Sequence, residues 1–218
     1  MGIPLMAQDE TLSQSIETVK APWVGSNYYQ EAERWTFVFW DAGRPFRKWF
    51  DRLDLTDTID LACGHGRHGE KSAPLCGRLT MIDVLPENVD VCRRRLGHLA
   101  NVDFASTEGA SYPVPNASVS AIYCYDAMVH FSPMIVESYL TDTARVLRPG
   151  GMALFHHSNY AAPTDQHYGL NPHARNHMTL AQFSEMAQRA GLAVSDQMPL
   201  AWGGEADLDG LTLVQRPT

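Results

Sequence analysis

Short apolar runs alternate with longer amphipathic stretches along most of this chain of 218 residues. The apolar runs predict strands at residues 58–63, 78–83, 101–106, 119–125, 152–158, 192–202 and 210–217. The amphipathic stretches predict helices at residues 86–100, 134–147 and 180–192, with Pro86 and Thr179 suited to helix starts and Gly191 to a helix end. Largely apolar strands that alternate with helices favour a parallel sheet covered by helices on both faces. The pattern therefore predicts an α/β domain.

A glycine-rich segment, DLACGHGRHGEK at residues 60–71, follows the first predicted strand. In a parallel sheet a ligand binds outside the carboxyl ends of the strands, so this loop is the expected ligand-binding position. Gly64, Gly66 and Gly69 have the G-x-G-x-x-G spacing of a dinucleotide loop, and Asp83 follows at the end of the second strand. The same segment also reads as an acidic residue, a small residue and G-x-G, the usual arrangement for S-adenosylmethionine. The glycine spacing alone leaves both cofactors open.

Three carboxylates near the ends of three successive strands favour S-adenosylmethionine. Asp60, inside the first strand, suits a ligand that carries an ammonium and a sulfonium, and it would repel a pyrophosphate. Asp83 can accept hydrogen bonds from both ribose hydroxyls. Glu108, after the third strand, is expected to meet the exocyclic amine of adenine. We therefore interpret Gly69 as an early helical residue with no role in binding a dinucleotide.

From Asp60 to Gly151 the chain resembles the class I S-adenosylmethionine-dependent methyltransferases of the small-molecule type. The resemblance is carried by DLACGHGR, MIDVLPENV, STEGASYPVP, SAIYCYDAMVHF and YLTDTARVLRPGG. It implies a Rossmann-like three-layer sandwich with a mostly parallel seven-stranded sheet, an antiparallel last strand beside the fifth, and an N-terminal helical cap. Ala62 stands where the family commonly has glycine, Glu108 where it has aspartate and Tyr112 where it has leucine.

The positions that match these motifs give the expected cofactor-binding residues. They are Asp60, Ala62, Cys63, Gly64, Gly66, Arg67, Asp83, Val84, Thr107, Glu108, Gly109, Tyr125 and Asp126. Arg67 and His68 are expected either to hold the methionine carboxylate of the cofactor or to be solvated in the first helical turn.

Methyl transfer is an in-line displacement, in which positioning and exclusion of water can supply most of the acceleration. A base is needed only where the acceptor must lose a proton, and the candidates are His157, His130 and Asp126. Alternation along a strand sends the rings of His156 and His157 to opposite faces, and His157 lies nearer to the strand end. His130 has packing beside the cofactor as its alternative role. A metal site at His157, His173 and His177 lacks a supporting carboxylate, so no metal is predicted.

Residues 23–50 hold ten of the chain's aromatic residues, and Gly43 and Pro45 are expected to divide them into two helices. This block is either a helical layer packed on the core or a lid over a ligand pocket. With the polar excursion at residues 158–178 it is expected to enclose an acceptor rich in hydroxyls or carrying a carboxylate. The predicted substrate-binding residues are Tyr29, Trp35, His157, Asn159, Tyr160 and Arg175.

The domain organisation expected from the sequence is a mobile segment at 1–22 and a single methyltransferase domain at 23–218. Within that domain, residues 23–53 form the helical cap and residues 158–178 an insertion on the acceptor side.

The formal net charge of -8 disfavours nucleic acid and anionic membrane as partners. We expect a cytoplasmic monomer or homodimer, because the chain shows neither a signal peptide nor an apolar run long enough to span a membrane. The four cysteines lack a C-x-x-C spacing, and we expect reduced thiols with Cys63 and Cys124 as buried neighbours.

The predicted function is transfer of a methyl group from S-adenosylmethionine to an oxygen or nitrogen of a small polar acceptor. Two alternatives remain at the level of sequence: an S-adenosylmethionine-binding protein without turnover, and a nicotinamide-dependent oxidoreductase.

Overall fold

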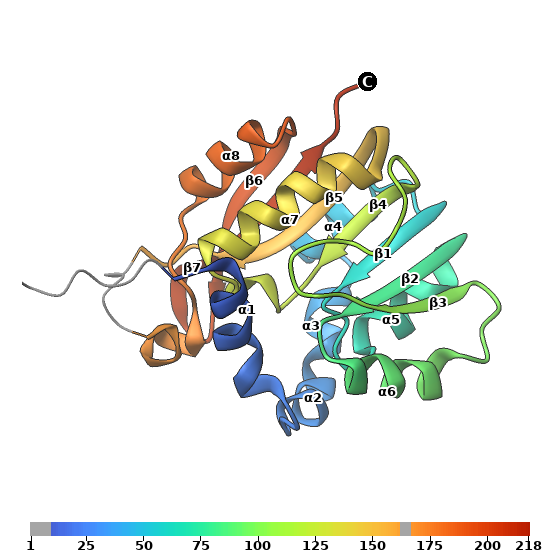
Figure 1. The fold of residues 1–218 in the computed structure, drawn as a ribbon, viewed down its shortest axis with the longest axis horizontal. Helices are drawn as coiled ribbons and strands as arrows, with labels where there is room; N and C mark the ends of the chain where they lie inside the picture. The colour runs from blue at the N-terminus through green and yellow to red at the C-terminus, as the bar shows by residue number, and fades with distance from the viewer. Residues whose placement is uncertain (1–9, 162–166) are drawn as a thin grey trace, which may run out of the picture.

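The computed structural model describes residues 10–161 and 167–218, and seven strands there form one sheet in the order β3-β2-β1-β4-β5-β7-β6 (Figure 1). The strands are β1 Asp57–Leu61, β2 Arg78–Asp83, β3 Val102–Ser106, β4 Val119–Cys124, β5 Leu147–Ser158, β6 Ala193–Trp202 and β7 Glu205–Gln215. Strands β1 to β5 pair in parallel, and β7 lies antiparallel between β5 and β6. This confirms the predicted fold class, with the last strand inserted beside the fifth. A dinucleotide-binding sheet of order 3-2-1-4-5-6 lacks that inserted strand.

Helices cover both faces of the sheet. The α-helices are α1 Leu12–Lys20, α2 Tyr28–Glu31, α3 Thr36–Trp40, α4 Pro45–Phe50, α5 Arg67–Ser72, α6 Pro86–Leu96, α7 Pro133–Val146 and α8 Leu180–Arg189. Short 3₁₀ turns are η1 Ala21–Trp23, η2 Ala32–Trp35, η3 Ala73–Leu75, η4 Met128–His130, η5 Tyr168–Leu170 and η6 Pro172–Ala174. In the described parts of the chain, no helix has the length and apolarity that crossing a bilayer requires.

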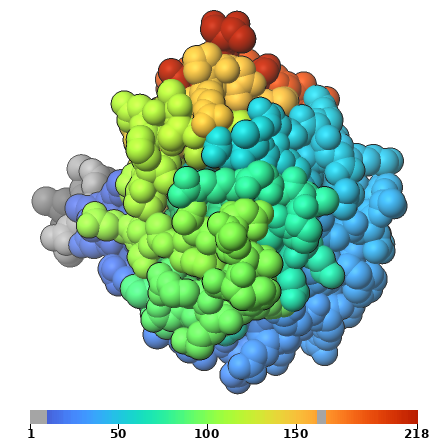
Figure 2. Space-filling model, turned by 90° about the vertical axis from the view of Figure 1, so that its right-hand side faces the viewer, coloured from blue at the N-terminus to red at the C-terminus, as the bar shows by residue number. Residues whose placement is uncertain are grey.

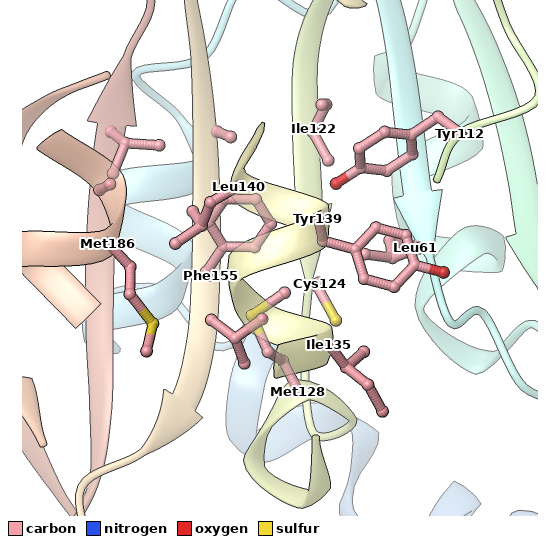
Figure 3. Packing of buried hydrophobic residues seen from close by; sticks show 14 of the residues in the cluster. Leu61, Tyr112, Ile122, Cys124, Met128, Ile135, Tyr139, Leu140, Phe155 and Met186 are labelled. Carbon is pink, nitrogen blue, oxygen red and sulfur yellow. The ribbon is translucent and has the colours of Figure 1, made fainter. Parts of the chain in front are cut away.

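One hydrophobic core lies between the sheet and helices α1, α7 and α8. Ile135, Tyr139 and Leu140 of α7 project toward Leu61 and Phe155 of the sheet (Figure 3). Ile135 and Tyr139 recur at helical spacing on one face of α7, so a single stripe of the helix is buried. Burial of each such side chain contributes roughly 1.5–3 kcal/mol to the stability of the fold. This burial holds α7 against strands β1, β4 and β5.

A second core lies on the opposite face and receives the aromatic side chains of α3 and α4. The ring of Phe46 lies 4.3 Å from that of Tyr125, and the ring of Phe50 lies 5.3 Å from that of Tyr123, measured between centroids. Gly43 has a positive φ of 95°, and α4 begins at Pro45, as the sequence predicts. Most of the aromatic block is therefore a packed helical layer, which Figure 2 shows in blue beside the green β2–β3 edge of the molecule.

Helix α1 corrects the expectation that residues 1–22 are mobile. Thr11 and Gln14 form a reciprocal capping box at its start. The Ser15 hydroxyl donates to the Ser132 hydroxyl at 2.6 Å, and Val19 is buried against the α7 side of the core. The segment is ordered because its cap satisfies the first backbone N–H groups and its inner face packs on the first core. Residues 1–9 lie outside the described part of the chain.

Candidate active site

A cavity lies at the carboxyl ends of β1, β2 and β4, where helices α1 and α2 cross the end of the sheet (Figure 1). Its empty volume is about 950 Å³, part of which is open solvent. The glycine loop forms its floor, the segments after β2, β3 and β4 form its sides, and α1, η1 and α2 form its cover. The cavity thus occupies the position predicted for the ligand from the order of strands and helices.

The backbone of the glycine loop has positive φ angles, which residues with a side chain rarely adopt. Gly64 and Gly66 have positive φ angles of 54° and 84°, and Ala62 also has a positive φ, of 56°. A Cβ on Gly64 would lie 3.0 Å from the ring of Tyr29, which packs directly on the loop. The amide of Gly64 donates to Asp83 Oδ2 at 2.8 Å. The backbone of the loop therefore lies close to the cavity, and the ring of Tyr29, the predicted substrate-binding residue, covers it.

Asp83 lies in the cavity wall, but only one of its oxygens retains capacity for a ligand. Asp83 Oδ1 accepts from the Leu85 amide at 2.9 Å and from Asn88 Nδ2 at 3.2 Å. Among the described residues, Asp83 Oδ2 accepts from Gly64 alone and so keeps one lone-pair site. Burial raises the pKa of this carboxyl group, while the hydrogen bonds lower it. Asn88 also donates to the Tyr29 hydroxyl at 3.0 Å, a link that sequence motifs gave no reason to expect.

Asp126 follows β4 and presents a buried carboxylate oxygen to the cavity wall. Its Oδ2 accepts from Arg67 Nη2 at 2.5 Å and from the Tyr28 hydroxyl at 2.6 Å. Its Oδ1 is buried and has no hydrogen-bond partner among the described residues. Arg67 is held in turn by the Ala32 carbonyl at 2.8 Å. The free oxygen of Asp126 is an acceptor in need of a donor, and an ammonium group suits it.

His68 lines the same cavity and carries a buried hydrogen-bond donor. Its Nδ1 accepts from Trp40 Nε1 at 3.0 Å, so the neutral ring carries its proton on Nε2. That Nε2 is buried and has no partner in the described part of the chain. Burial lowers the pKa of His68 well below its usual value, so the ring is neutral at physiological pH. An N–H donor in this position suits a carboxylate of a ligand.

His130, on η4, lines the cavity as a neutral base. Its Nδ1 lies 2.8 Å from the Ala174 carbonyl, which can only accept, so Nδ1 carries the proton and Nε2 keeps its lone pair. Burial lowers the pKa of His130 to about 4. The Trp23 ring packs on it with centroids 4.7 Å apart. His130 is therefore packed and neutral, and its Nε2 keeps a lone pair whose basicity burial has lowered.

The cavity wall does not include the predicted site residues Asp60, Gly66, Glu108 and Trp35. Asp60 is buried behind the glycine loop. Its Oδ2 lies close to Gly69, since a Cβ added to Gly69 would stand 3.4 Å from that oxygen. Glu108 is exposed to solvent, whereas its neighbours in sequence, Thr107 and Gly109, line the cavity. Trp35 is 51% exposed, with the Arg34 guanidinium over its ring.

The structure also corrects which histidine of β5 faces the site. His157 is fully buried on the opposite face of the sheet, where its ring stacks on Phe183 at 3.9 Å and its Nε2 lies 2.8 Å from the Thr212 hydroxyl. His156 instead faces the end of β4, and its Nδ1 accepts from the amide of Asp126 at 3.1 Å. Alternation of the two rings was predicted correctly, but distance from the strand end does not determine which ring faces the site.

The described part of the acceptor-side insertion packs against β7 and behind two residues of the cavity wall, since the Ala174 carbonyl lies 2.8 Å from His130 Nδ1 and the Tyr168 hydroxyl donates to the Val19 carbonyl at 3.3 Å. Arg175 forms a bidentate ion pair with Asp209 at 2.7 and 2.6 Å. Asn159 donates to the Asp207 carbonyl at 2.8 Å, and Tyr160 forms a bridge with His177. Neither Arg175, Asn159 nor Tyr160 lines the cavity. The polar side chains of Asn159 and Arg175 therefore connect the insertion to the hairpin of β6 and β7.

The Cys63 thiol lies 3.7 Å from that of Cys92, so its neighbour is not Cys124 as expected. All four cysteines are buried and free. Within residues 10–161 and 167–218, no group of three or more His, Cys, Asp and Glu side chains is arranged to hold a metal ion.

Comparison with known proteins shows that residues 59–151 match the family described as "Methyltransferase domain". The chain is 27% identical over 103 residues to nodulation protein S of Rhizobium tropici, a match that covers 46% of this chain and 42% of that protein. It is 29% identical over 99 residues to the fatty-acid O-methyltransferase of Mycolicibacterium smegmatis, covering 44% of this chain and 35% of that protein. The chain thus spans less than half the length of these curated relatives.

A solved structure of an S-adenosylmethionine-dependent methyltransferase from Mesorhizobium loti superposes with a TM-score of 0.66 at 14% identity, covering 81% of this chain and 99% of that chain. At this identity the likeness shows a shared fold. The family match, the inserted antiparallel strand and the glycine loop lead to one assignment. Residues 59–151 of the chain match a methyltransferase domain, and the sheet around them has the fold of the class I S-adenosylmethionine-dependent methyltransferases.

Proposed function

We propose that this chain binds S-adenosylmethionine in the cavity and transfers its methyl group to an oxygen or nitrogen of a small acceptor. The observation that carries the proposal is the pair of unsatisfied groups in one cavity wall: a buried acceptor on Asp126 Oδ1 and a buried donor on His68 Nε2. The methionine portion of the cofactor carries an ammonium and a carboxylate, which would satisfy both. Leaving either group unpaired costs about 1–3 kcal/mol, so a ligand that pairs both is favoured.

The remaining parts of the cofactor would be held by neighbouring segments. Asp83 Oδ2 has one lone-pair site for a ribose hydroxyl. Val84, Thr107 and Gly109 line the part of the cavity next to it, where adenine would lie. Gly109 has a φ of 94°, and a Cβ there would lie 2.7 Å from Ile16 Cγ2 of the cover. Close packing of Ile16 on this backbone supports a flat adenine pocket closed by α1.

The acceptor we propose has an apolar body rather than the polar one expected from residues 158–178. The cavity wall around His130 is apolar and aromatic, and is formed by Val19, Trp23, Phe131 and Ile135. An apolar body would be driven into this wall by removal of its surface from water, at about 25 cal/mol per Å². One nucleophilic oxygen or nitrogen would face the cofactor. The fatty-acid O-methyltransferase among the relatives has an acceptor of this general kind by its name.

When bound, S-adenosylmethionine supplies a methyl group attached to a positively charged sulfur. The role of the chain is to hold the two reactants in line and to exclude water. Tyr28, Tyr29 and Trp23 cover the cavity and limit the entry of water. His130 Nε2 would accept the proton of an acceptor hydroxyl or amine, because its lone pair is free at physiological pH.

Calorimetry with S-adenosylhomocysteine tests the cofactor, and a screen of apolar alcohols, carboxylic acids and amines by mass spectrometry tests transfer of one methyl group. We expect binding and a methylated product from at least one acceptor class. Binding of NADH without binding of S-adenosylhomocysteine would overturn the assignment. Binding without a product from any class would instead identify a cofactor-binding protein without turnover.

A further inference from the structure

A buried polar chain connects the acceptor-side insertion to the end of β4. Arg175 holds Asp209 through two hydrogen bonds, at 2.7 and 2.6 Å. Asp209 Oδ2 lies 2.9 Å from His156 Nε2, and His156 Nδ1 accepts from the amide of Asp126 at 3.1 Å. Asp209 and His156 are fully buried, and Arg175 is 2% exposed. Water therefore does not compete for any of these contacts.

The geometry fixes the imidazole of His156 in one tautomer. An amide N–H can only donate, so His156 Nδ1 must carry a lone pair and Nε2 must carry the proton. The Nε2–H then donates to Asp209. Burial alone would raise the pKa of Asp209, but the bonds from His156 and Arg175 lower it to about 2, so Asp209 is ionised at physiological pH. An ionised Asp209 keeps His156 oriented with its lone pair toward Asp126.

Asp126 needs such support because its backbone is strained. Its φ is 57°, a left-handed conformation that costs about 1–3 kcal/mol for a residue other than glycine. Within the part of the chain that the structure describes, its amide donates to His156 alone. Arg67 and Tyr28 fix the side chain of Asp126 through Oδ2, whereas His156 fixes its backbone. Together they determine where Oδ1 lies in the cavity wall.

We infer that the His156–Asp209 pair, clamped by Arg175, is a positioning device that aims Asp126 at the ammonium of the cofactor. This inference rests on the proposed function, because it takes Asp126 Oδ1 as the ammonium acceptor. It assigns a role to the last hairpin and to Arg175, neither of which touches the cavity. His156 acts through Asp126, and it is not itself a catalytic residue.

The test compares His156→Gln, His156→Asn and His157→Gln by calorimetry with S-adenosylhomocysteine. The amide of Gln can reach Asp209 but leaves no acceptor at the position of Nδ1, whereas the carbonyl of Asn can stand at that position. His157→Gln is the matched control, because it removes an equally buried imidazole from the next position of the same strand. We expect His156→Gln to weaken binding by about tenfold or more, the equivalent of one lost buried hydrogen bond, and the other two variants by less than about threefold. Urea unfolding of each variant measures its loss of stability separately.

Equal affinity of His156→Gln and His157→Gln, with binding intact in the unaltered protein, would overturn the inference and leave the proposed function standing. No binding by the unaltered protein would overturn both. If His156→Gln does not fold, Asp209→Asn replaces it, because it keeps the shape of the side chain but removes the charge that orients His156. That variant is expected to bind about threefold more weakly, and unchanged affinity would count against the positioning role.

Discussion

The Tyr28 hydroxyl donates to Asp126 Oδ2 at 2.6 Å, across 98 positions of sequence. Burial of Tyr28 and the adjacent carboxylate both raise the pKa of its hydroxyl, so it remains a donor throughout the physiological range. The contact joins the helical cover to the residue whose other oxygen is free in the cavity. This hydrogen bond therefore couples closure of the cover to the geometry of the proposed cofactor site, as do the bonds from Arg67 to the Ala32 carbonyl and from Asn88 to the Tyr29 hydroxyl.

Tyr28→Phe should weaken binding of S-adenosylhomocysteine by about five- to tenfold, because one hydrogen bond to a charged group is lost while the ring is kept. Tyr112→Phe is the control, since it removes a buried hydroxyl that is bonded to Thr143 at 3.1 Å, from a residue that does not line the cavity. Calorimetry on both variants measures the effect. A loss of the same size in Tyr112→Phe would mean that the change reflects general loosening of the fold.

Gly64→Ala should abolish measurable cofactor binding. Its φ of 54° disfavours any side chain, and the new methyl group would press on the Tyr29 ring at 3.0 Å. Gly191→Ala carries a comparable backbone cost, with a φ of 83°, but meets no atom within 4 Å and lies far from the cavity along the chain. Both variants should lose roughly 1 kcal/mol of stability in urea unfolding. Normal binding by Gly64→Ala would contradict the placement of the cofactor on this loop.

Asp60→Asn should change how stability depends on pH. Burial raises the pKa of Asp60 to about 7, above its unfolded value of 3.8. The folded state then binds the proton more tightly, so the contribution of Asp60 is fully present below about pH 4 and is lost as pH rises through about 7. Removing the ionisable group should raise the free energy of unfolding at pH 8 by on the order of a few kcal/mol, with little effect at pH 4. Urea unfolding at both pH values checks this, and a parallel shift at the two values would contradict it.

His130→Gln should lower kcat by roughly 10²–10⁴ on an acceptor that must lose a proton, because the variant lacks a basic nitrogen. Since burial lowers the pKa of His130 to about 4, kcat of the unaltered protein should not fall between pH 8 and pH 5.5 through protonation of this ring, and should fall as pH approaches 4. His157→Gln, outside the cavity, is the control. Unchanged kcat in His130→Gln would leave positioning alone as the source of the rate.

The sequence allowed prediction of the sheet and its inserted strand, and several predicted site residues line one cavity. Gly64, Asp83 and Asp126 lie where the motifs place them, because each stands directly at a strand end and the backbone alone carries it to the cavity. Apolar periodicity was sufficient to identify the strands, since burial on both faces leaves little freedom in their composition.

Side-chain direction was harder to predict. Glu108, in the loop after β3, is exposed to solvent, while Gly109 lines the cavity. His156 rather than His157 faces Asp126, because a shift of one residue along a strand reverses the side on which a side chain lies. Arg175 was predicted to bind the acceptor because of its charge, but its guanidinium forms a buried ion pair with Asp209. Such pairings depend on contacts between distant segments, which spacing along one chain does not reveal.

Helix α1 yields the last prediction, because the sequence led us to expect a mobile segment there and the structure makes it a wall of the cavity. Ile16 packs on Gly109 and lines the cavity, whereas Glu17 on the next position is 68% exposed at its side chain. Ile16→Ala should therefore weaken binding of S-adenosylhomocysteine by about threefold to tenfold, because apolar surface against the ligand is lost, and Glu17→Ala should not. Hydrogen exchange should show slower exchange across residues 12–20 and 26–42 when the ligand is added, since a cover that closes on the ligand opens less often. If exchange in both segments is unaffected by the ligand and Ile16→Ala binds normally, α1 is packing for the α7 side of the core and the cofactor lies elsewhere in the cavity.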